Sequence, residues 1–575
     1  MSEFLNQSFK QAKSKNLLLF FLGITLLFNL LQAYLTGLHP DEAYYWVYAQ
    51  FLDWGYFDHP PMVAIFIKAG YFLFNNPLGL RLFTVLSNAL ALYLLWLIVK
   101  KYGVHIQLFI IMVSSVLLFH VYSFITTPDV PLFFFSVLFL YVYQLYLKED
   151  KIKWALALGI ICAGLMLSKY HGILLIFFVL LSNFKLFTRK SFYLTIILGV
   201  ALCLPHLYWQ YLNGYPSLYY HLIDRSAKAY KFVYSSQYFI DQLLMMGPLV
   251  GWLFFYYGYK LKAQEDLFLR ALKFVVYGVF SFFFISTFKG RVQAQWPLIE
   301  FIALFILGYV YAVQNLAAFK KFKWLFGVNI LLILIARFVI MGYIPALNKI
   351  KFVASFQNYE AWAQEIKAEA KGYSVVFEDG FQEPSFYNFY TQSLKGVAYN
   401  SINYRQTQYD LWPLEDSLQN KKVLLLQVGE ATLLNQKTIE TIKGTYHITW
   451  LDSVRYYPKI NFEPINFPKE WKANEEIGIT FKVVNPYHRA ISFASENQKW
   501  ACIFQYGYLK NGNIIKIEPI ESTLNNLTIE AKQSINVKIN IKAPPQTGDY
   551  KLFISIKTEP FVGTRNSKMI NMNVK

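Results

Sequence analysis

Long apolar stretches recur between residues 17 and 341 and constrain the fold of this chain more than any other feature. A helix needs about 20 apolar residues to cross the hydrocarbon core of a bilayer. Stretches near this length are found at 17–36, 82–99, 106–124, 131–147, 192–209, 239–258, 271–288, 295–313 and 323–341. They predict an all-α polytopic membrane domain, because helices satisfy their own backbone hydrogen bonds in lipid.

Two shorter apolar stretches, 154–168 and 171–184, flank the polar run Ser168–His171. We interpret them as two helices that meet in a tight turn, since a charged residue is tolerated best near the membrane interface. This gives about eleven transmembrane helices. The alternative is one long broken helix, which would reverse the orientation of every later segment.

The distribution of charge predicts the orientation. The chain has 55% hydrophobic and 15% charged residues, with a formal net charge of +19. A basic chain could bind nucleic acid, but here Lys and Arg collect in alternate loops. The segments on the side of the N-terminus carry more than twice as many as those on the other side. The positive-inside rule therefore predicts a cytoplasmic N-terminus, a C-terminal tail on the opposite face and no nucleic-acid partner.

The composition becomes that of a soluble protein near residue 345. We predict a transmembrane domain over 1–344, a small α/β domain over 345–455 and a β-sandwich over 456–575. In the second domain, helical patterns at 359–370 and 383–391 alternate with strand patterns at 373–377 and 422–428. In the third, alternating runs at 477–484, 534–541 and 550–556 are separated by turn residues.

An acidic and aromatic cluster follows the first apolar segment directly. Asp41 and Glu42 lie next to aromatic residues, and a carboxylate there could act as a general base on a hydroxyl group. The alternative is an interfacial belt, where Trp and Tyr are common. The residues predicted to contact the substrate in this region are Tyr44, Tyr45, Trp46, Asp58 and His59.

Three further polar segments are predicted on the same outer face. Asp129 could share a cavity with Asp41 or Glu42, or could only cap the helix that follows it. The turn around Lys169 and Tyr170 and the segment with Lys289 and Arg291 carry cations suited to a phosphate group. Their alternative role is contact with lipid headgroups. Two acidic and two cationic sites on one face together favour a lipid-phosphate substrate.

The motifs that carry these residues resemble the polytopic GT-C glycosyltransferases of families 39 and 83. This group includes bacterial aminoarabinose and galacturonic acid transferases that act on lipid A, and the dolichyl-phosphate-mannose protein mannosyltransferases are relatives. The resemblance spans roughly residues 15–455 and leaves the β-sandwich outside. Its motifs lie at 39–46, 55–61, 127–132, 168–170 and 405–413.

The resemblance implies transfer, with inversion, of a sugar from a polyprenyl-phosphate donor. The acceptor would be lipid A, another glycolipid, a polysaccharide or a protein on the periplasmic face of the inner membrane. Position in the motifs makes Asp41 the expected base, Glu42 its support and Asp129 a second acid. Lys169 and Arg291, with Lys289, become the expected phosphate contacts.

We expect no obligatory metal, although Mg or Mn would be compatible with the acids. The alternative function is a lipid-linked sugar transporter or flippase. A transporter would place charged or broken helices near the bilayer midplane.

Overall fold

The computed structural model describes residues 2–224, 230–429, 436–495, 498–520 and 523–575. The chain divides into two compact units, Met1–Gln357 and Asn358–Lys575. The first unit is helical, and every strand of the described residues belongs to the second. Residues 345–357, which the sequence suggested as the start of the tail, belong to the first unit, where Phe356 packs with Ala33 and Val85.

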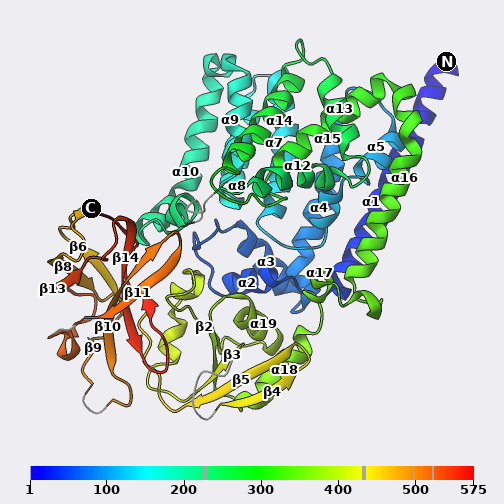
Figure 1. Cartoon of the computed structure of the whole chain (residues 1–575). Coiled ribbons are helices and arrows are strands. Elements are labelled where there is room, and N and C mark those ends of the chain that lie inside the picture. The colour runs from blue at the N-terminus through cyan, green and yellow to red at the C-terminus, as the bar shows by residue number, and fades with distance from the viewer. Residues whose placement is uncertain (1, 225–229, 430–435, 496–497, 521–522) are drawn as a thin grey trace. The chain divides into compact units, whose positions relative to one another are not determined.

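The long helices of the first unit coincide with apolar stretches of the sequence, whereas the shorter helices at 40–50, 62–73, 216–219 and 351–354 lie outside them. The helices are α1 (Ser2–Leu35), α2 (Pro40–Gln50), α3 (Met62–Leu73), α4 (Pro77–Val99), α5 (Ile106–Val113), α6 (Leu117–Val121), α7 (Asp129–Lys148), α8 (Ile152–Ser168), α9 (Gly172–Ser182), α10 (Lys190–Leu212), α11 (Pro216–Tyr219), α12 (Phe232–Met246), α13 (Gly251–Lys260), α14 (Leu267–Ser286), α15 (Leu298–Gln314), α16 (Leu316–Ile340) and α17 (Lys351–Ala354) (Figure 1). The prediction of a helical membrane domain is confirmed.

Within the described residues, six helices are long and apolar enough to cross a membrane: α1, α4, α7, α10, α14 and α16. The pair α12 and α13, bent by 91°, makes a seventh if it is one span. The expected number of about eleven also included the shorter helices α8, α9 and α15 and the segment 106–124. That segment is broken between α5 and α6.

Helix α15 is buried along almost its whole length. Apart from the buried Glu300, its buried residues are mostly apolar and lie on every side, which is typical of a helix inside a bundle. It packs against α13 and α14 and also contacts α4, α5 and α7. The membrane bundle is therefore organised around α15.

Helices α2 and α3 lie at one end of the bundle, where α1 ends and α4 begins (Figure 1). With 11 and 12 residues they are too short to cross a bilayer. Helix α2 is nevertheless largely buried. This end of the bundle carries most of the polar residues singled out in the sequence.

The second unit begins with a small α/β fold, as predicted. Strands β1 (Ser374–Glu378), β2 (Gly396–Tyr399) and β3 (Val423–Gln427) are parallel, while β4 (Lys437–Thr441) and β5 (Gly444–Leu451) are antiparallel to their neighbours, in the order β2-β1-β3-β5-β4. Helices α18 (Tyr359–Ala370) and α19 (Gln382–Thr391) pack together, and α19 covers β1 and β2.

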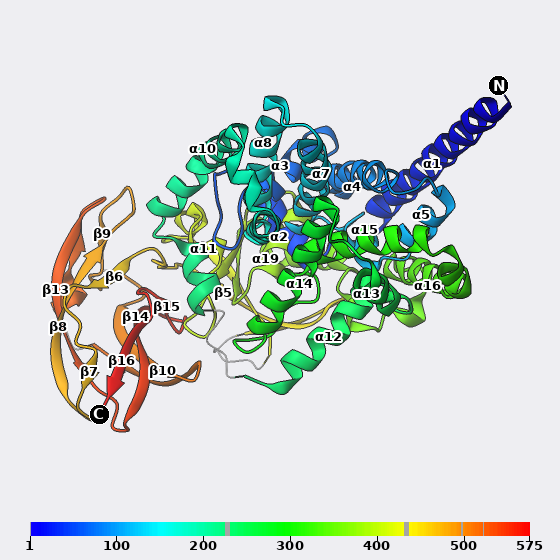
Figure 2. The same ribbon diagram turned by 90° about the horizontal axis from the view of Figure 1, so that it is seen from above.

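The remaining strands form a sandwich. One sheet has the order β11-β10-β14-β16-β7 and the facing sheet has the order β13-β8-β6 (Figure 2). The bounds are β6 (Asn461–Pro464), β7 (Glu470–Trp471), β8 (Glu476–Val484), β9 (Ile491–Ser492), β10 (Cys502–Lys510), β11 (Asn513–Pro519), β12 (Thr528–Ile529), β13 (Ser534–Lys542), β14 (Gly548–Thr558), β15 (Thr564–Arg565) and β16 (Ile570–Val574). Both sheets contribute to one apolar core, for example Phe481 and Leu552.

Candidate active site

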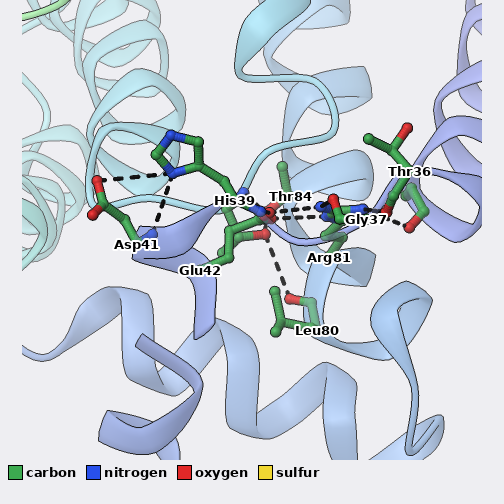
Figure 3. Close-up of polar contacts among 10 residues, drawn as sticks. Thr36, Gly37, His39, Asp41, Glu42, Leu80, Arg81 and Thr84 are labelled. Atoms are coloured by element: carbon green, nitrogen blue, oxygen red, sulfur yellow. Dashed lines mark hydrogen bonds and ion pairs between the residues drawn. The ribbon is translucent and has the colours of Figure 1, made fainter. Parts of the chain in front are cut away.

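The first turn of α2 places Asp41 and Glu42 directly after α1. Pro40 occupies the first helical turn, and the backbone N–H of His39 donates to Glu42 Oε2 at 2.8 Å. The backbone N–H of Asp41 donates to His39 Nδ1 at 3.2 Å. Consecutive residues of a helix point roughly 100° apart, so the two acids face different surroundings. Figure 3 shows Asp41 beside His39 and Glu42 directed toward Arg81.

Glu42 is fully buried and paired with the fully buried Arg81 of α4. Arg81 Nε donates to Glu42 Oε1 at 2.8 Å and Nη2 donates to Oε2 at 2.6 Å. This is a two-pronged, charge-assisted pair, which is among the stronger polar contacts in proteins. The backbone N–H of Thr126 adds a bond of 2.8 Å to Oε1. Glu42 therefore positions the site and has no open side for a substrate.

Arg81 extends this network to the end of α1. Its guanidinium donates to the backbone carbonyls of Ala33, Thr36 and Gly37 at 2.7–2.9 Å. The network thus joins α1, α2, α4 and the loop before α7. Sequence reasoning did not assign Arg81 to the site, although a charged residue near the start of an apolar helix is a recognisable sign of function.

Asp41 is the accessible acid of the two, with 39% of its side chain exposed. Its Oδ2 lies 3.9 Å from His39 Nδ1. Because Glu42 fixes the start of the helix, it also fixes the backbone position of Asp41. Of the two neighbouring acids, Asp41 is the one that can reach a ligand.

Asp129 and Lys169, predicted for separate roles, form a buried ion pair. Lys169 Nζ lies 2.7 and 2.9 Å from the two carboxylate oxygens of Asp129. Asp129 begins α7 and Lys169 follows the end of α8, so each charge also suits the dipole of its own helix. Asp129 therefore holds the ammonium group of Lys169 in place, and Tyr122 interacts with the same carboxylate.

The surroundings of Tyr45 bring three of the predicted acids into one region. Burial raises the pKa of Tyr45 well above its usual value, and the carboxylates of Asp41, Asp58 and Asp129 raise it further. All three acids therefore lie within electrostatic range of one hydroxyl group. The ring of His59 lies 5.7 Å from that of Tyr45, so this predicted residue also borders the site.

Two other aromatic residues that were predicted to contact the substrate pack against other rings of the protein. Tyr44 contacts the ring of Tyr48 at 4.8 Å, and Trp46 contacts Tyr71 of α3 at 5.8 Å. Both Tyr44 and Trp46 are buried. Their rings build the core around α2 in this structure.

The loop that carries Asp58 and His59 is fastened to α10. His206 Nδ1 donates to the carbonyl of Trp54 at 2.7 Å, and Trp209 Nε1 donates to Asp53 Oδ2 at 2.7 Å. Gly55 fits between them, since a Cβ there would lie 2.5 Å from the Trp209 ring and 2.9 Å from His206. Sequence reasoning missed His206 and Trp209 because nothing near them in the chain suggests that they reach this loop.

Tyr170 belongs to the same network. Its hydroxyl lies 3.1 Å from His206 Nε2 and accepts from Gln210 Nε2 at 3.0 Å. Nε2 of His221 donates to the carbonyl of Asp58 at 3.0 Å, and the His221 ring lies 5.9 Å from that of Tyr170. The turn with Lys169 and Tyr170 is therefore connected to the loop with Asp58.

Lys289 and Arg291 are exposed in the turn between α14 and α15. Among the described residues, neither side chain has an ion-pair partner. The same turn continues to Trp296, whose ring lies 5.4 Å from that of His171. The segment with Lys289 and Arg291 therefore approaches the turn that carries Lys169. In the part of the chain that the structure describes, no three His, Cys, Asp or Glu side chains are grouped as metal ligands.

Comparisons with known proteins bear on the fold of this chain. Residues 58–209 match the family described as dolichyl-phosphate-mannose-protein mannosyltransferase. No curated protein matches the chain significantly. The structure is similar to that of ArnT from Cupriavidus metallidurans in the apo state, with a TM-score of 0.57 and 14% identity over 76% of this chain and 98% of ArnT.

A second ArnT structure from the same organism, bound to undecaprenyl phosphate, aligns with a TM-score of 0.55 and 13% identity over 75% of this chain and 98% of ArnT. The family match covers the loop with Asp58, the acid Asp129 and the turn with Lys169. The predicted resemblance to the GT-C glycosyltransferases is confirmed, and the chain has the fold of ArnT.

Proposed function

We propose that this chain is a membrane glycosyltransferase that moves a sugar from a polyprenyl-phosphate donor to an acceptor hydroxyl. The observation that carries the proposal is the gathering of Asp41, Asp58 and the Asp129–Lys169 pair around Tyr45. An accessible carboxylate beside a fixed cation is what transfer from a sugar phosphate requires. The likeness to ArnT, which has been observed bound to undecaprenyl phosphate, supports a lipid-linked donor.

In the proposed reaction, Asp41 accepts the proton of the acceptor hydroxyl. The acceptor oxygen attacks the anomeric carbon as the bond between that carbon and the phosphate oxygen breaks. The electron pair of the broken bond leaves with the polyprenyl phosphate. Attack from the opposite side inverts the anomeric centre.

The leaving phosphate gains negative charge and needs cations that are already in position. Lys169 is held by Asp129 and has one N–H of its ammonium group left for a phosphate oxygen. Lys289 and Arg291 are exposed, and we assign them to the same phosphate. Glu42 and Asp129 act as positioning residues in this scheme.

The proposed location is the bacterial inner membrane, with the N-terminus in the cytoplasm and the second unit in the periplasm. The support for this orientation is the excess of Lys and Arg in the loops on the side of the N-terminus. The acceptor would then be a periplasmic lipid A, glycolipid, polysaccharide or protein. Lipid and sugar are the partners we propose.

The test is transfer of a labelled sugar by the purified protein from polyprenyl-phosphate donors to a mixture of envelope acceptors. Asp41→Asn should lower the rate by at least about 100-fold, the usual minimum for loss of a general base. Asp452→Asn, at an exposed acid of the second unit, is the matched control and should keep full activity. Equal rates in all three proteins would refute Asp41 as the base.

The same assay separates the enzyme from the transporter. If folded wild-type protein transfers no sugar from any of several donors, the glycosyltransferase proposal fails. Movement of a lipid-linked sugar across vesicles by that protein would then support a transporter or flippase.

We also propose that no metal ion is obligatory, because the candidate base and the phosphate contacts need none in this scheme. Excess EDTA should therefore leave the transfer rate of the wild-type protein unchanged within about twofold. Activity that disappears on chelation and returns with Mg or Mn would contradict this proposal.

A further inference from the structure

Arg337 is a buried cation in the apolar helix α16. Only 4% of the residue is exposed, and within the described residues its guanidinium has no carboxylate partner. A charge in this environment is expensive unless something compensates it. Arg337 lies in the last turn of a helix that is long and apolar enough to cross a membrane, and the side chains around it shield its charge from bulk water.

The hydrogen-bond partners of Arg337 are neutral, and the ring centroids of Phe28 and Phe124 lie 4.3 and 5.1 Å from its Cζ. Nε donates to Gln32 Oε1 at 2.5 Å and Nη2 donates to Asn29 Oδ1 at 2.7 Å, both on α1. Nη1 lies 3.1 Å from His120 Nδ1, and Nε2 of the same His lies 2.9 Å from the carbonyl of Ser114. His120 therefore donates through Nε2 and accepts through Nδ1, which makes it neutral.

These contacts leave the guanidinium incompletely satisfied. Arginine has five N–H donors, and the neutral partners take three of them. One N–H remains on Nη1 and one on Nη2, the two positions with which arginine grips a phosphate. The amide Nδ2 of Asn29, beside Arg337, is also buried and has no hydrogen-bond partner among the described residues.

A small cavity of about 30 Å³, open on one side, lies against Arg337. Its polar wall contains Thr25, Asn88 and Ser123 beside Arg337 and His120. Its other side chains are apolar, among them Phe21 and Leu92. A cavity with a cation and hydroxyl groups on one wall and apolar side chains on another suits the junction between a charged headgroup and its hydrocarbon chain.

We propose that this cavity binds the phosphate group of an anionic membrane lipid, with Arg337 as its counter-ion. The lipid can approach from the bilayer, because α1 and α16 expose apolar side chains such as Leu27, Leu31 and Leu331. The site uses none of the residues assigned to the donor phosphate, so it is a second lipid site. Its occupancy does not depend on the proposed sugar transfer.

Native mass spectrometry of the full-length protein in detergent tests the proposal. Phosphatidylglycerol and phosphatidylcholine are added in turn, and the retained lipid is counted. Wild-type protein should retain one phosphatidylglycerol and no phosphatidylcholine at the same concentration. Arg337→Gln should lower this retention at least tenfold, whereas Lys323→Gln, an exposed cation on the same helix, should not change it.

Thr25→Phe tests the cavity without removing the charge. The larger ring should fill the space and lower phosphatidylglycerol retention, and this variant decides the question if Arg337→Gln does not fold. Equal retention of phosphatidylglycerol in folded Thr25→Phe and wild-type protein would overturn the proposal.

Inorganic phosphate distinguishes a free anion from a lipid headgroup. At millimolar concentration it should not raise the melting temperature of the wild-type protein. If it raises that temperature, but not that of Arg337→Gln, and phosphatidylglycerol is not retained, the anion is a free phosphate and the lipid assignment is wrong.

Discussion

At the scale of single residues, neighbouring acids differ in role because their surroundings differ. Glu42 is enclosed by Arg81 and by the backbone N–H groups of His39 and Thr126, whereas Asp41 faces outward from the same helical turn. The sequence predicted that Asp41 and Asp129 belong to one region, and both lie within electrostatic range of Tyr45. It could not predict the pairs Glu42–Arg81 and Asp129–Lys169, which join residues 39 and 40 positions apart.

The ion pair of Glu42 and Arg81 should be essential for stability. Arg81→Met leaves a buried carboxylate without its counter-charge, which typically costs about 3–5 kcal/mol of unfolding free energy. Thermal unfolding in detergent should therefore show a much lower melting temperature than wild type. The double variant Glu42→Met with Arg81→Met should regain part of the loss, and a double variant less stable than Arg81→Met would contradict this explanation.

Asp410 should make the stability of the second unit depend on pH. Burial raises the pKa of Asp410 to about 6, although Thr407 and Asn400 donate hydrogen bonds that lower it. A raised carboxyl pKa means that the folded state binds the proton more tightly than the unfolded state. The associated stability is present below the unfolded pKa near 3.8 and is lost as pH rises to about 6.

Asp410→Asn removes this titration and is the matched comparison. The difference in melting temperature between wild type and variant should change between about pH 4 and pH 6, in the direction that disfavours wild type at higher pH. Above and below this window the difference should be constant. A difference that does not vary from pH 3.5 to pH 7 would show that Asp410 has no raised pKa.

At the scale of elements, the apolar pattern of helices and the alternation of apolar and polar residues in strands predicted several elements correctly. The predicted helix at 359–370 coincides with α18, and the predicted strand at 534–541 is β13 within one residue. The interruptions in 106–124 and 239–258 were not predicted. The first falls at Ser114 and Ser115, and the second at Gly247 and Pro248, a pair that often ends a helix. Apolar composition indicates depth in the membrane, but it does not reveal where a helix stops and turns.

The loop before α3 provides a test of element packing. Gly55→Ala would place a methyl group against Trp209 and His206 on α10 and displace the loop that carries Asp58. We expect the sugar-transfer rate to fall at least tenfold, because small displacements of a catalytic region cost large factors in rate. Gly23→Ala is the control, since nothing lies within 4 Å of its added methyl group. Equal rates would show that the loop tolerates the displacement.

At the scale of the whole molecule, the sequence predicted a membrane domain followed by soluble domains with mixed and all-β architecture. The structure has the same order of architectures, in two compact units. Phe356 explains why the first unit extends beyond residue 344: its buried ring packs between α1 and α4. A change in overall composition cannot locate such a contact, because one buried side chain decides it.

Orientation across the membrane is the prediction at this scale. Lys538→Cys lies at an exposed position of β13, and Lys153→Cys lies at an exposed position near the start of α8. A membrane-impermeant maleimide added to spheroplasts should label the first variant and not the second, with wild type as the control for its own three cysteines. The reverse pattern would show that the N-terminus is periplasmic.

The network around Arg81 has a consequence for biosynthesis. The ribosome makes Glu42 before it makes Arg81, and 39 positions separate them. Until α4 leaves the ribosome and enters the membrane, the carboxylate of Glu42 lacks its counter-ion and the start of α2 lacks its anchor. Asp41, the acid at the centre of the proposed reaction, therefore reaches its final position only after α4 has been inserted. A nascent chain that stops before residue 81 lacks an assembled active site.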